Sequence, residues 1–339
     1  MQVERRETVV DVTRVVVAIS DGSNSGEVVE VLPEGADWRF EPDWDGLGVT
    51  VCLGPGTDRL VSDRGRGFDR FFPEVAGAVA AMPVDGVVVR GSLVVVGPTG
   101  LDFASVRQRL HPSPMRVRLL AASTPATLVL TDIVIDGTGD LSASPIAVRR
   151  RQLERLARAL DITVALPNLR HMPPGRPALL TPQTLDRRVA MSWLLDLDAA
   201  GRDGLIARHA DSERWARVRR TRTAACVATG FRRSGSGELA AVRLGMYDQQ
   251  GLVDVDRTAP IRRAPARRAV VAALTAATPE GERDTPSVAG KDWVDVPPTL
   301  VCEVRFDRLR GRKFRNAVSI VRWLRDRDPS TCTIDQLAP

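Results

Sequence analysis

A short polar stretch and the apolar run that follows it constrain the fold of this chain most. Residues 41–46 have the sequence E-P-D-W-D-G, and the side chains of 47–53 then alternate as in a half-buried β-strand. A second strand is predicted at 87–96, which is strongly apolar except at Arg90 and Ser92. The first core of the protein is therefore expected to form around β-strands.

Length and composition place the chain among ordinary folded proteins. Its 339 residues are enough for two domains, each with a sizeable core. The hydrophobic fraction of 43% and the charged fraction of 27% are typical of globular proteins. No stretch approaches the ~18 apolar residues of a membrane-spanning helix, and the charged N-terminus leads into no signal-peptide core. We therefore expect a cytoplasmic protein with no membrane partner.

Cysteine and histidine give no sign of a metal site. None of these residues lies at metal-ligand spacing from another, and no C-x-x-C pair occurs. Widely separated cysteines in an intracellular protein are usually buried free thiols, and we predict that here. The residues concerned are Cys52, Cys226, Cys302, Cys332, His111, His171 and His209.

The positive charge of the chain is almost entirely arginine. The net charge is +6, from 48 basic and 42 acidic residues, and the pI is near 9.8. Lys291 and Lys313 are the only lysines, and both are predicted to lie on the surface of a second domain. Arginine binds phosphate readily, but its guanidinium stays protonated and cannot act as a nucleophile. The charge balance permits nucleic-acid binding without requiring it.

The pattern E-P-x-W-D-G at 41–46 resembles the adenylation motif of the ATP-dependent DNA ligases. In that family x is a lysine, whose amine attacks the α-phosphate of ATP to give a covalent lysyl-AMP. Here that position is Asp43. A carboxylate cannot form the phosphoramidate bond, and it repels a unit negative charge ~4 Å away by about 4 kcal/mol at an effective dielectric constant near 20. The resemblance therefore implies a ligase whose central chemical group is absent.

Other motifs of the same pocket also depart from the family pattern. Gly48 stands where the family has an arginine, and Arg90 and Ser92 stand where it has Asp and Glu. Thr131 replaces an aromatic residue that stacks on adenine, an interaction worth about 1–3 kcal/mol. Three lysines that grip the nucleotide correspond to arginines here. The pocket residues implied by the resemblance are Asp45, Gly46, Gly91, Ser92, Asp132, Arg208, Arg217 and Arg219.

ATP and Mg²⁺ are the cofactors that the resemblance implies. Asp203 keeps an acidic position that binds the metal in the family, whereas Ser92 offers no charge to organise Mg²⁺. Because the nucleophile is missing, we expect that this chain does not use ATP covalently.

The resemblance spans 41–339 and is strongest in core-forming segments such as 100–126 and 289–307. It implies an α+β fold, with a nucleotidyltransferase (adenylation) domain of antiparallel sheets and helices at 1–220, followed by an OB-fold β-barrel domain at 221–339. In the second domain, we predict strands at 226–230, 240–247, 253–255 and 300–306, and a helix at 264–277.

Apolar spacing predicts two further helices in the first domain, at 144–160 and 181–200. Residues 166–180, rich in Pro and Arg, are predicted to form a connector between them. Three arginines at 149–151 fall near the start of the first helix. We interpret them as a solvated face rather than as DNA contacts.

Two functions fit these observations. One is a repair-associated protein that has lost self-adenylation and binds nicked or broken duplex DNA or a repair partner. The other is an active DNA ligase that still seals nicks, including nicks that are already adenylated; a different nucleotidyl chemistry is a third, weaker interpretation. We expect a monomer associated with the nucleoid. The arginines implicated in DNA binding are Arg64, Arg305, Arg315, Arg322 and Arg325.

Overall fold

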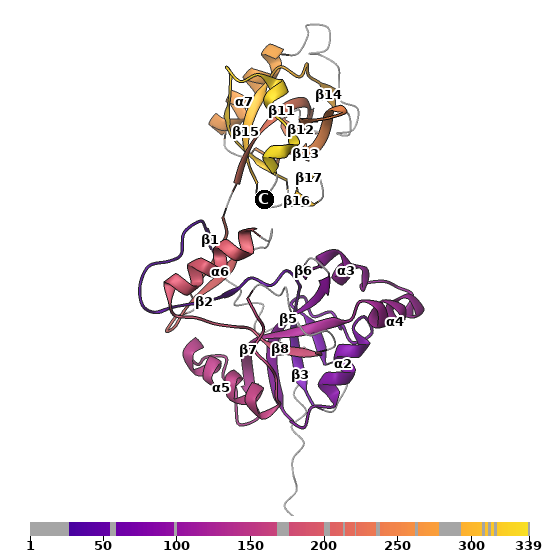
Figure 1. The fold of residues 1–339 in the computed structure, drawn as a ribbon, viewed down its shortest axis with the longest axis vertical. Coiled ribbons are helices and arrows are strands. Elements are labelled where there is room, and N and C mark those ends of the chain that lie inside the picture. Colours follow the sequence, from indigo (N-terminus) through magenta and orange to yellow (C-terminus); the bar gives the residue numbers. More distant parts are fainter. Residues whose placement is uncertain are drawn as a thin grey trace, which may run out of the picture. The chain divides into compact units, whose positions relative to one another are not determined.

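A computed structural model divides the chain into two compact units, Met1–Arg219 and Arg220–Pro339, each described by itself. Figure 1 shows the ribbon coloured along the sequence, from indigo at the N-terminus to yellow at the C-terminus. The structure describes residues 27–54, 59–97, 100–167, 176–199, 204–212, 214–220, 222–234, 238–261, 264–277, 293–306, 309–310, 313–314 and 317–337.

The larger sheet of the first unit is rich in valine, whose branched side chain suits the pleated surface of a sheet. Its strands follow the order β4-β3-β5-β7-β8, and of these neighbours only β7 and β8 run parallel. Alternate residues of each strand therefore face opposite sides of the sheet. The strands are β3 (Leu47–Leu53), β4 (Leu60–Ser62), β5 (Val87–Gly97), β6 (Gly100–Leu101), β7 (Ala126–Asp136) and β8 (Ala178–Leu180).

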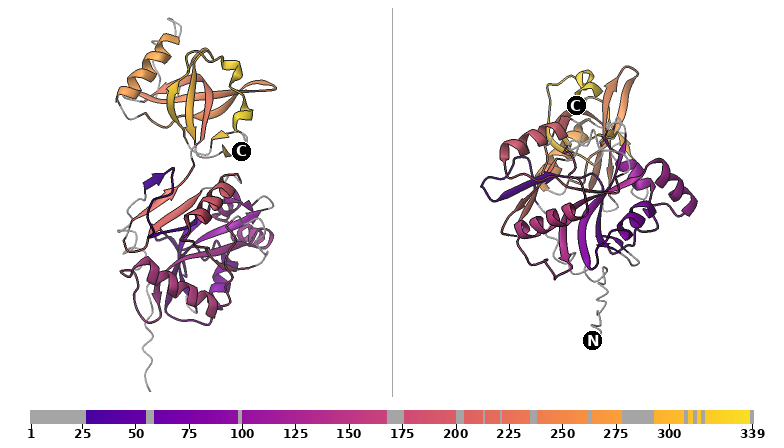
Figure 2. Two further views of the ribbon diagram at one scale, coloured as in Figure 1. Left: turned by 60° about the vertical axis from the view of Figure 1, so that its left-hand side comes forward. Right: turned by 60° about the horizontal axis from the view of Figure 1, so that its bottom comes forward.

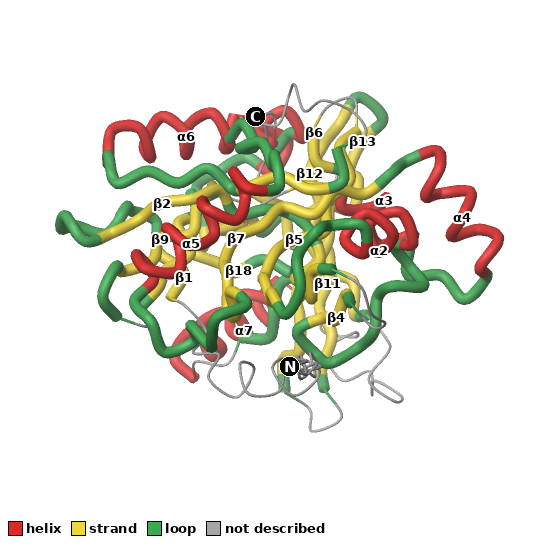
Figure 3. The backbone as a smooth tube through the Cα atoms, turned by 90° about the horizontal axis from the view of Figure 1, so that it is seen from below, coloured by secondary structure: helices red, strands yellow, loops and turns green. Residues whose placement is uncertain are grey.

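Four helices contribute to a core on one face of this sheet. Figure 1 and Figure 3 show α2, α3 and α4 together at one side of β5, and α5 beside β7. Nη2 of Arg109 lies 2.7 Å from both carboxylate oxygens of Glu74, which ties α2 to the segment after α3. Among the described residues, no helix is both long and apolar enough to cross a membrane. The helices are α2 (Pro73–Ala80), α3 (Phe103–Gln108), α4 (Pro114–Ser123) and α5 (Ile146–Ala159).

A smaller sheet of four strands completes the first unit, in the order β1-β10-β9-β2. The helix α6 covers it, with Ala190, Leu194 and Leu197 buried against apolar residues of β2 and β9. The elements are β1 (Glu27–Val29), β2 (Trp38–Pro42), α6 (Arg187–Ala199), β9 (Leu205–His209) and β10 (Trp215–Val218).

A β-bulge changes the register between β5 and β7. Arg90 lies opposite Asp132, whereas the next residue, Gly91, lies opposite Leu130, so Thr131 has no direct partner. A bulge of this kind redirects the side chains that follow it. Arg90 and Asp132 both end on the sheet face that lines the pocket described below.

The second unit is built on a six-stranded antiparallel sheet with the path β13-β12-β11-β15-β18, and β14 pairs with β11. Val270 and Leu274 of α7 pack into its core, and Figure 2 shows α7 beside the strands. The elements are β11 (Arg222–Arg233), β12 (Leu239–Asp248), β13 (Gly251–Arg257), α7 (Ala264–Ala277), β14 (Val294–Asp295), β15 (Val301–Phe306), β16 (Leu309–Arg310), β17 (Lys313–Phe314), β18 (Ser319–Trp323) and the 3₁₀ turns η3 (Pro329–Thr331) and η4 (Ile334–Leu337).

Two predictions about the first unit were wrong in detail. The helix predicted at 181–200 begins only at Arg187, because Thr184 exchanges two backbone hydrogen bonds of 2.9 Å with Phe40 and holds the preceding chain extended. The connector predicted at 166–180 ends in the strand β8, whose three residues are all buried. A strand this short and fully buried leaves no alternating pattern to detect.

Candidate functional site

The two sheets of the first unit form the walls of a polar pocket of about 350 Å³. One wall comes from β2, β9 and β10, and the other from β3, β5 and β7, with Ile146 and Arg149 at the start of α5 completing the lining. The charges of the lining cancel, because four acidic and four basic residues contribute to it: Glu41, Asp43, Asp63, Asp132, Arg90, Arg149, Arg208 and Arg217.

Asp43 follows directly after β2 and is held in place by a backbone hydrogen bond to Gly204 (2.9 Å). Nη2 of Arg219 donates a 3.1 Å hydrogen bond to its Oδ2, and Nε of Arg217 lies 2.9 Å from the same oxygen. Arg217 and Arg219 are two residues apart at the end of β10, so their side chains share one side of the strand. The Asp43 side chain is only 9% exposed. The carboxylate of Asp43 therefore pairs with two guanidinium groups at the pocket.

Glu41 forms a second ion pair from the adjacent strand. Its Oε1 accepts a 2.8 Å hydrogen bond from Nε of Arg208 on β9. Burial disfavours the charge of Arg208, but the carboxylates of Glu41, Asp132 and Asp43 outweigh that effect and raise its pKa. The other oxygen of Glu41, Oε2, is buried and accepts no hydrogen bond from the described residues.

Asp132 and Arg149 form a third pair. Nε and Nη2 of Arg149 donate to the two oxygens of Asp132 at 3.0 and 3.1 Å, in the two-pronged geometry that strengthens such pairs. Arg150 is also buried and pairs with Glu154 (2.7 Å). The interpretation of the arginines at 149–151 as a solvated face was therefore wrong for the first two, and only Arg151 is exposed.

Two glycines let backbone and side chains approach closely in this pocket. A Cβ at residue 48 would collide with the carboxylate of Asp63, and one at residue 91 would collide with the carbonyl oxygen of Val129. The space above Gly48 is thus filled by Asp63, which introduces a carboxylate where the family resemblance places an arginine. A larger side chain at either glycine requires the neighbouring chain to move.

Arg90 is the exception among the charged residues of the lining. Its guanidinium makes no hydrogen bond and no ion pair within the part of the chain that the structure describes, whereas Arg149, Arg208 and Arg217 each have a carboxylate partner. Burial lowers the pKa of Arg90, and Asp63 and Asp132 offset this only in part. The pocket therefore contains one guanidinium without a bound anion.

The residues predicted from the sequence fall into three groups. Asp43, Gly91, Ser92, Asp132, Arg208 and Arg217 line the pocket, and Arg219 contacts it through Asp43. Asp45 and Gly46 lie outside the lining, and the proposed metal ligand Asp203 lies outside the described residues. The lining also includes residues that were not predicted as part of the site, among them Glu41, Asp63, Arg149 and Trp215.

The pocket does not fit ATP and Mg²⁺ in the way that the family resemblance implies. No group of three His, Cys, Asp or Glu residues suited to a metal ion occurs among the described residues. Arg208, Arg217 and Arg219 already hold carboxylates, so their charge is not available to a triphosphate without breaking ion pairs.

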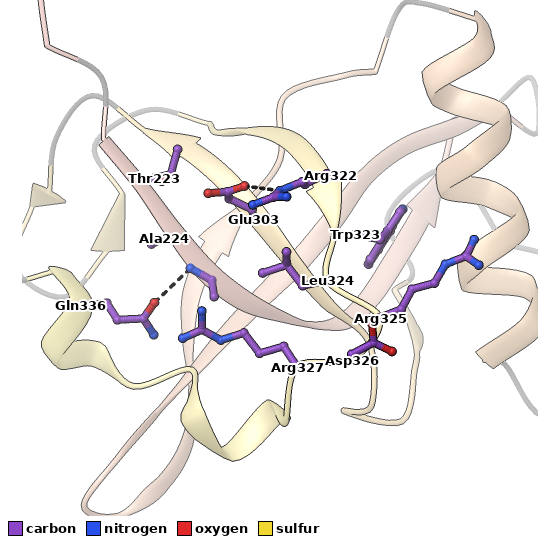
Figure 4. Close-up of a pocket in the computed structure, with 11 residues that line it drawn as sticks. Thr223, Ala224, Glu303, Arg322, Trp323, Leu324, Arg325, Asp326, Arg327 and Gln336 are labelled. Carbon is purple, nitrogen blue, oxygen red and sulfur yellow. Dashed lines mark hydrogen bonds and ion pairs between the residues drawn. The ribbon is translucent and has the colours of Figure 1, made fainter.

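The second unit carries a larger, open pocket of about 800 Å³ between β11, β15 and the chain after β18. Figure 4 shows Arg322 paired with Glu303, with Nε of Arg322 2.7 Å from Oε2, while Arg325 points away from that pair. Gln336 anchors the rim, because its Oε1 accepts a 3.1 Å hydrogen bond from the backbone of Ala225. Arg322 and Arg325 thus lie at one pocket.

The other predicted DNA-binding arginines are dispersed. Arg305 is exposed on β15, and Arg64 is exposed in the turn after β4 of the first unit. Arg315 lies outside the described residues.

Comparisons with known proteins identify the family. The chain is 33% identical over 332 residues to DNA ligase C1 of Mycolicibacterium smegmatis, covering 91% of each chain. It is 31% identical over 331 residues to DNA ligase C of Mycobacterium tuberculosis, covering 89% of each. A solved structure of a Lig E DNA ligase matches with a TM-score of 0.55 at 13% identity, covering 88% of this chain and 99% of that one, which bears on the fold alone. No protein-family model matches.

The chain therefore belongs to the family of small bacterial ATP-dependent DNA ligases, as its motifs predicted. Its fold is mixed α+β, with sheets and few helices, and resembles that of ATP-dependent DNA ligases. In this chain Asp43, the third residue of the stretch E-P-D-W-D-G, is held by two arginines.

Proposed function

We propose that this protein is a DNA-ligase homologue that has lost self-adenylation and serves by binding duplex DNA in repair. The ion pairing of Asp43 with Arg217 and Arg219 carries the proposal. Formation of lysyl-AMP needs an amine lone pair that attacks the α-phosphorus of ATP while pyrophosphate leaves. Both lysines of the chain, Lys291 and Lys313, lie beyond Arg219, outside the first unit.

DNA binding requires charge but not this nucleophile, because phosphate contacts depend on cations spread over a surface. We propose that 1–220 is the nucleotidyltransferase domain and that 221–339 is an OB-fold, a class of barrel that grips nucleic acids. The antiparallel sheet with a single long helix supports this assignment. Arg325 at the pocket of the second unit is a proposed phosphate contact, and Arg322 is a second one because its pair with Glu303 is exposed and therefore weak.

A second candidate function is sealing of nicks that already carry a 5′-adenylate. The open pocket of about 350 Å³ between the two sheets favours it, because an adenylate needs room there but no lysine. The two candidates differ in whether the protein joins strands or only holds them.

The decisive experiment incubates the full chain with Mg²⁺ and ATP labelled at the α-phosphate, beside an active ligase as a positive control. We expect no covalent protein-AMP in the wild type or in Asp43→Lys, because Gly48, Ser92 and Thr131 also depart from the family pattern. A stable wild-type adenylate would overturn the proposal. Joining of a pre-adenylated nick by the wild type would establish the second candidate instead.

Binding to a fluorescent nicked duplex between 50 and 200 mM salt tests the DNA-binding half. Affinity is expected to fall steeply with salt, and Arg325→Met is expected to reduce the slope of log K against log salt by about one. Arg118→Met, which removes an exposed arginine of α4, is the matched control. Absence of duplex binding at the lowest salt would refute this half.

A further inference from the structure

The pocket of the first unit contains two groups whose bonding capacity is unused. Arg90 lies on β5 with its guanidinium among Asp63, Asp132, Arg149 and Arg208, close enough for their charges to act on it. It makes no hydrogen bond within the described chain. A partly buried guanidinium without an anion is at higher energy than one that is paired, so an anionic ligand is favoured there.

The second group is Oε2 of Glu41, on the opposite wall. The Glu41 side chain is 2% exposed, and Oε2 has no donor among the described residues although Oε1 is bonded to Arg208. A buried carboxylate oxygen without a donor is costly, and a ligand hydroxyl satisfies it. An anion receptor and a hydroxyl receptor thus share one pocket.

We propose that this pocket binds a sugar phosphomonoester, with the phosphate on Arg90 and a sugar hydroxyl on Glu41, in preference to a nucleoside triphosphate. The inference rests on the proposed function, since it concerns a site that no longer forms a covalent adenylate. The same chemistry is offered by a free nucleoside monophosphate and by the 5′-terminal nucleotide of a DNA strand.

Charge decides the preference for one phosphate. Arg149, Arg208 and Arg217 are each paired with a carboxylate, so only Arg90 is available among the cations that line the pocket in the described chain. Two further phosphates would face Asp43 and Asp63 without a cation to balance them. The base contributes little, because Thr131 offers no stacking surface where the family resemblance expects an aromatic ring.

The test is calorimetric titration of the full chain with ribose 5-phosphate, AMP, ATP and adenosine. We expect one site for the two monophosphates, at least tenfold weaker binding of ATP, and no binding of adenosine. Arg90→Met is expected to weaken monophosphate binding at least tenfold, and Arg90→Lys to retain part of it. Arg118→Met is the control, and unchanged circular dichroism shows that each variant is folded.

A parallel titration compares nicked duplexes with a 5′-phosphate or a 5′-hydroxyl at the nick. A preference for the 5′-phosphate that Arg90→Met abolishes identifies the strand end as the source, and competition by AMP alone identifies the free nucleotide. Tighter binding of ATP than of AMP, or indifference to Arg90→Met, would overturn the inference. Duplex binding that ignores the 5′-phosphate and AMP also overturns it, but leaves the proposed function standing.

Discussion

Replacement of Asp43 by asparagine removes the negative charge of this side chain with little change in its size, and so tests what that charge contributes. The side chain keeps its shape and one carbonyl oxygen, but the two arginines lose their common anion. We expect the first unit to lose stability, because Arg217 and Arg219 are then held beside a neutral group in a site where Asp43 itself is only 9% exposed.

The magnitude follows from the exposure of each pair. Hydrogen bonds to charged groups contribute about 1.5–3 kcal/mol when they are shielded, and exposed ion pairs contribute at most about 1 kcal/mol. Arg219 is 20% exposed and belongs nearer the first class, whereas Arg217 is 37% exposed and belongs nearer the second. The expected loss is about 2–3 kcal/mol, which lowers the Tm of a unit this size by roughly 4–12 °C.

The assay is thermal and urea unfolding of the wild type, Asp43→Asn, Arg219→Met and the double variant. The double-mutant cycle is expected to give a coupling energy of about 1 kcal/mol or more. Asp211→Asn, at an exposed aspartate of the same unit, is the matched control and is expected to change stability by less than about 0.5 kcal/mol. A coupling energy near zero would show that the contact between Asp43 and Arg219 does not stabilise the first unit, and would refute this prediction.

Three further predictions concern the scaffold. Gly91→Ala is expected to cost about 1–3 kcal/mol of unfolding free energy, because the new Cβ collides with a backbone carbonyl. Gly77→Ala is expected to stabilise the protein by up to about 1 kcal/mol, because Gly77 lies on α2 with open space around it. Urea unfolding measures both variants. Hydrogen bonds from Ser105 lower the pKa of Asp102, the N-cap of α3. The stability that the ionised Asp102 contributes is present above the unfolded pKa and is lost as pH falls through the lower folded pKa. Asp102→Ala should therefore cost about 1 kcal/mol at pH 7 and progressively less below about pH 4. Equal costs at pH 7 and pH 2.5 would contradict this prediction. Burial raises the pKa of Cys302 to about 12, so at pH 8 roughly one Cys302 thiol in ten thousand is ionised. Cys302 of the native protein should therefore resist alkylation at pH 8 until guanidinium chloride unfolds the protein.

The elements with long, regular patterns were predictable from the sequence. The strand expected at 47–53 and the helix expected at 264–277 end where the structure ends them, because each has enough residues for its period to be visible. The strand β8 was not predictable, since three buried residues carry no period. The start of α6 depends on Thr184 pairing with Phe40, a contact that no local pattern encodes.

The membership of the site was predictable in part, and its ion pairing was not. Motif positions indicated that Asp43, Arg217 and Arg219 share a pocket, and the structure brings them together. Their pairing was not predicted, because Asp43 and Arg219 are 176 residues apart and each was compared separately with the family pattern. One signal in the sequence could have indicated the pairing. Asp43 stands at a motif position where the family has a cation, and Arg217 and Arg219 stand at other positions of the same pocket. Opposite charges expected in one pocket are candidates for an ion pair.

That complementarity argues against simple decay of the pocket. Random loss of the ATP site would leave cations facing one another, and the electrostatic cost of burying them would fall on the fold. Instead Asp43 meets Arg217 and Arg219, Glu41 meets Arg208, and the lining sums to zero charge without a nucleotide. A pocket that is neutral on its own keeps its shape without a bound nucleotide. Arg90 is then the informative residue, because it is the one cation of the described lining that this internal pairing leaves without a bonded carboxylate.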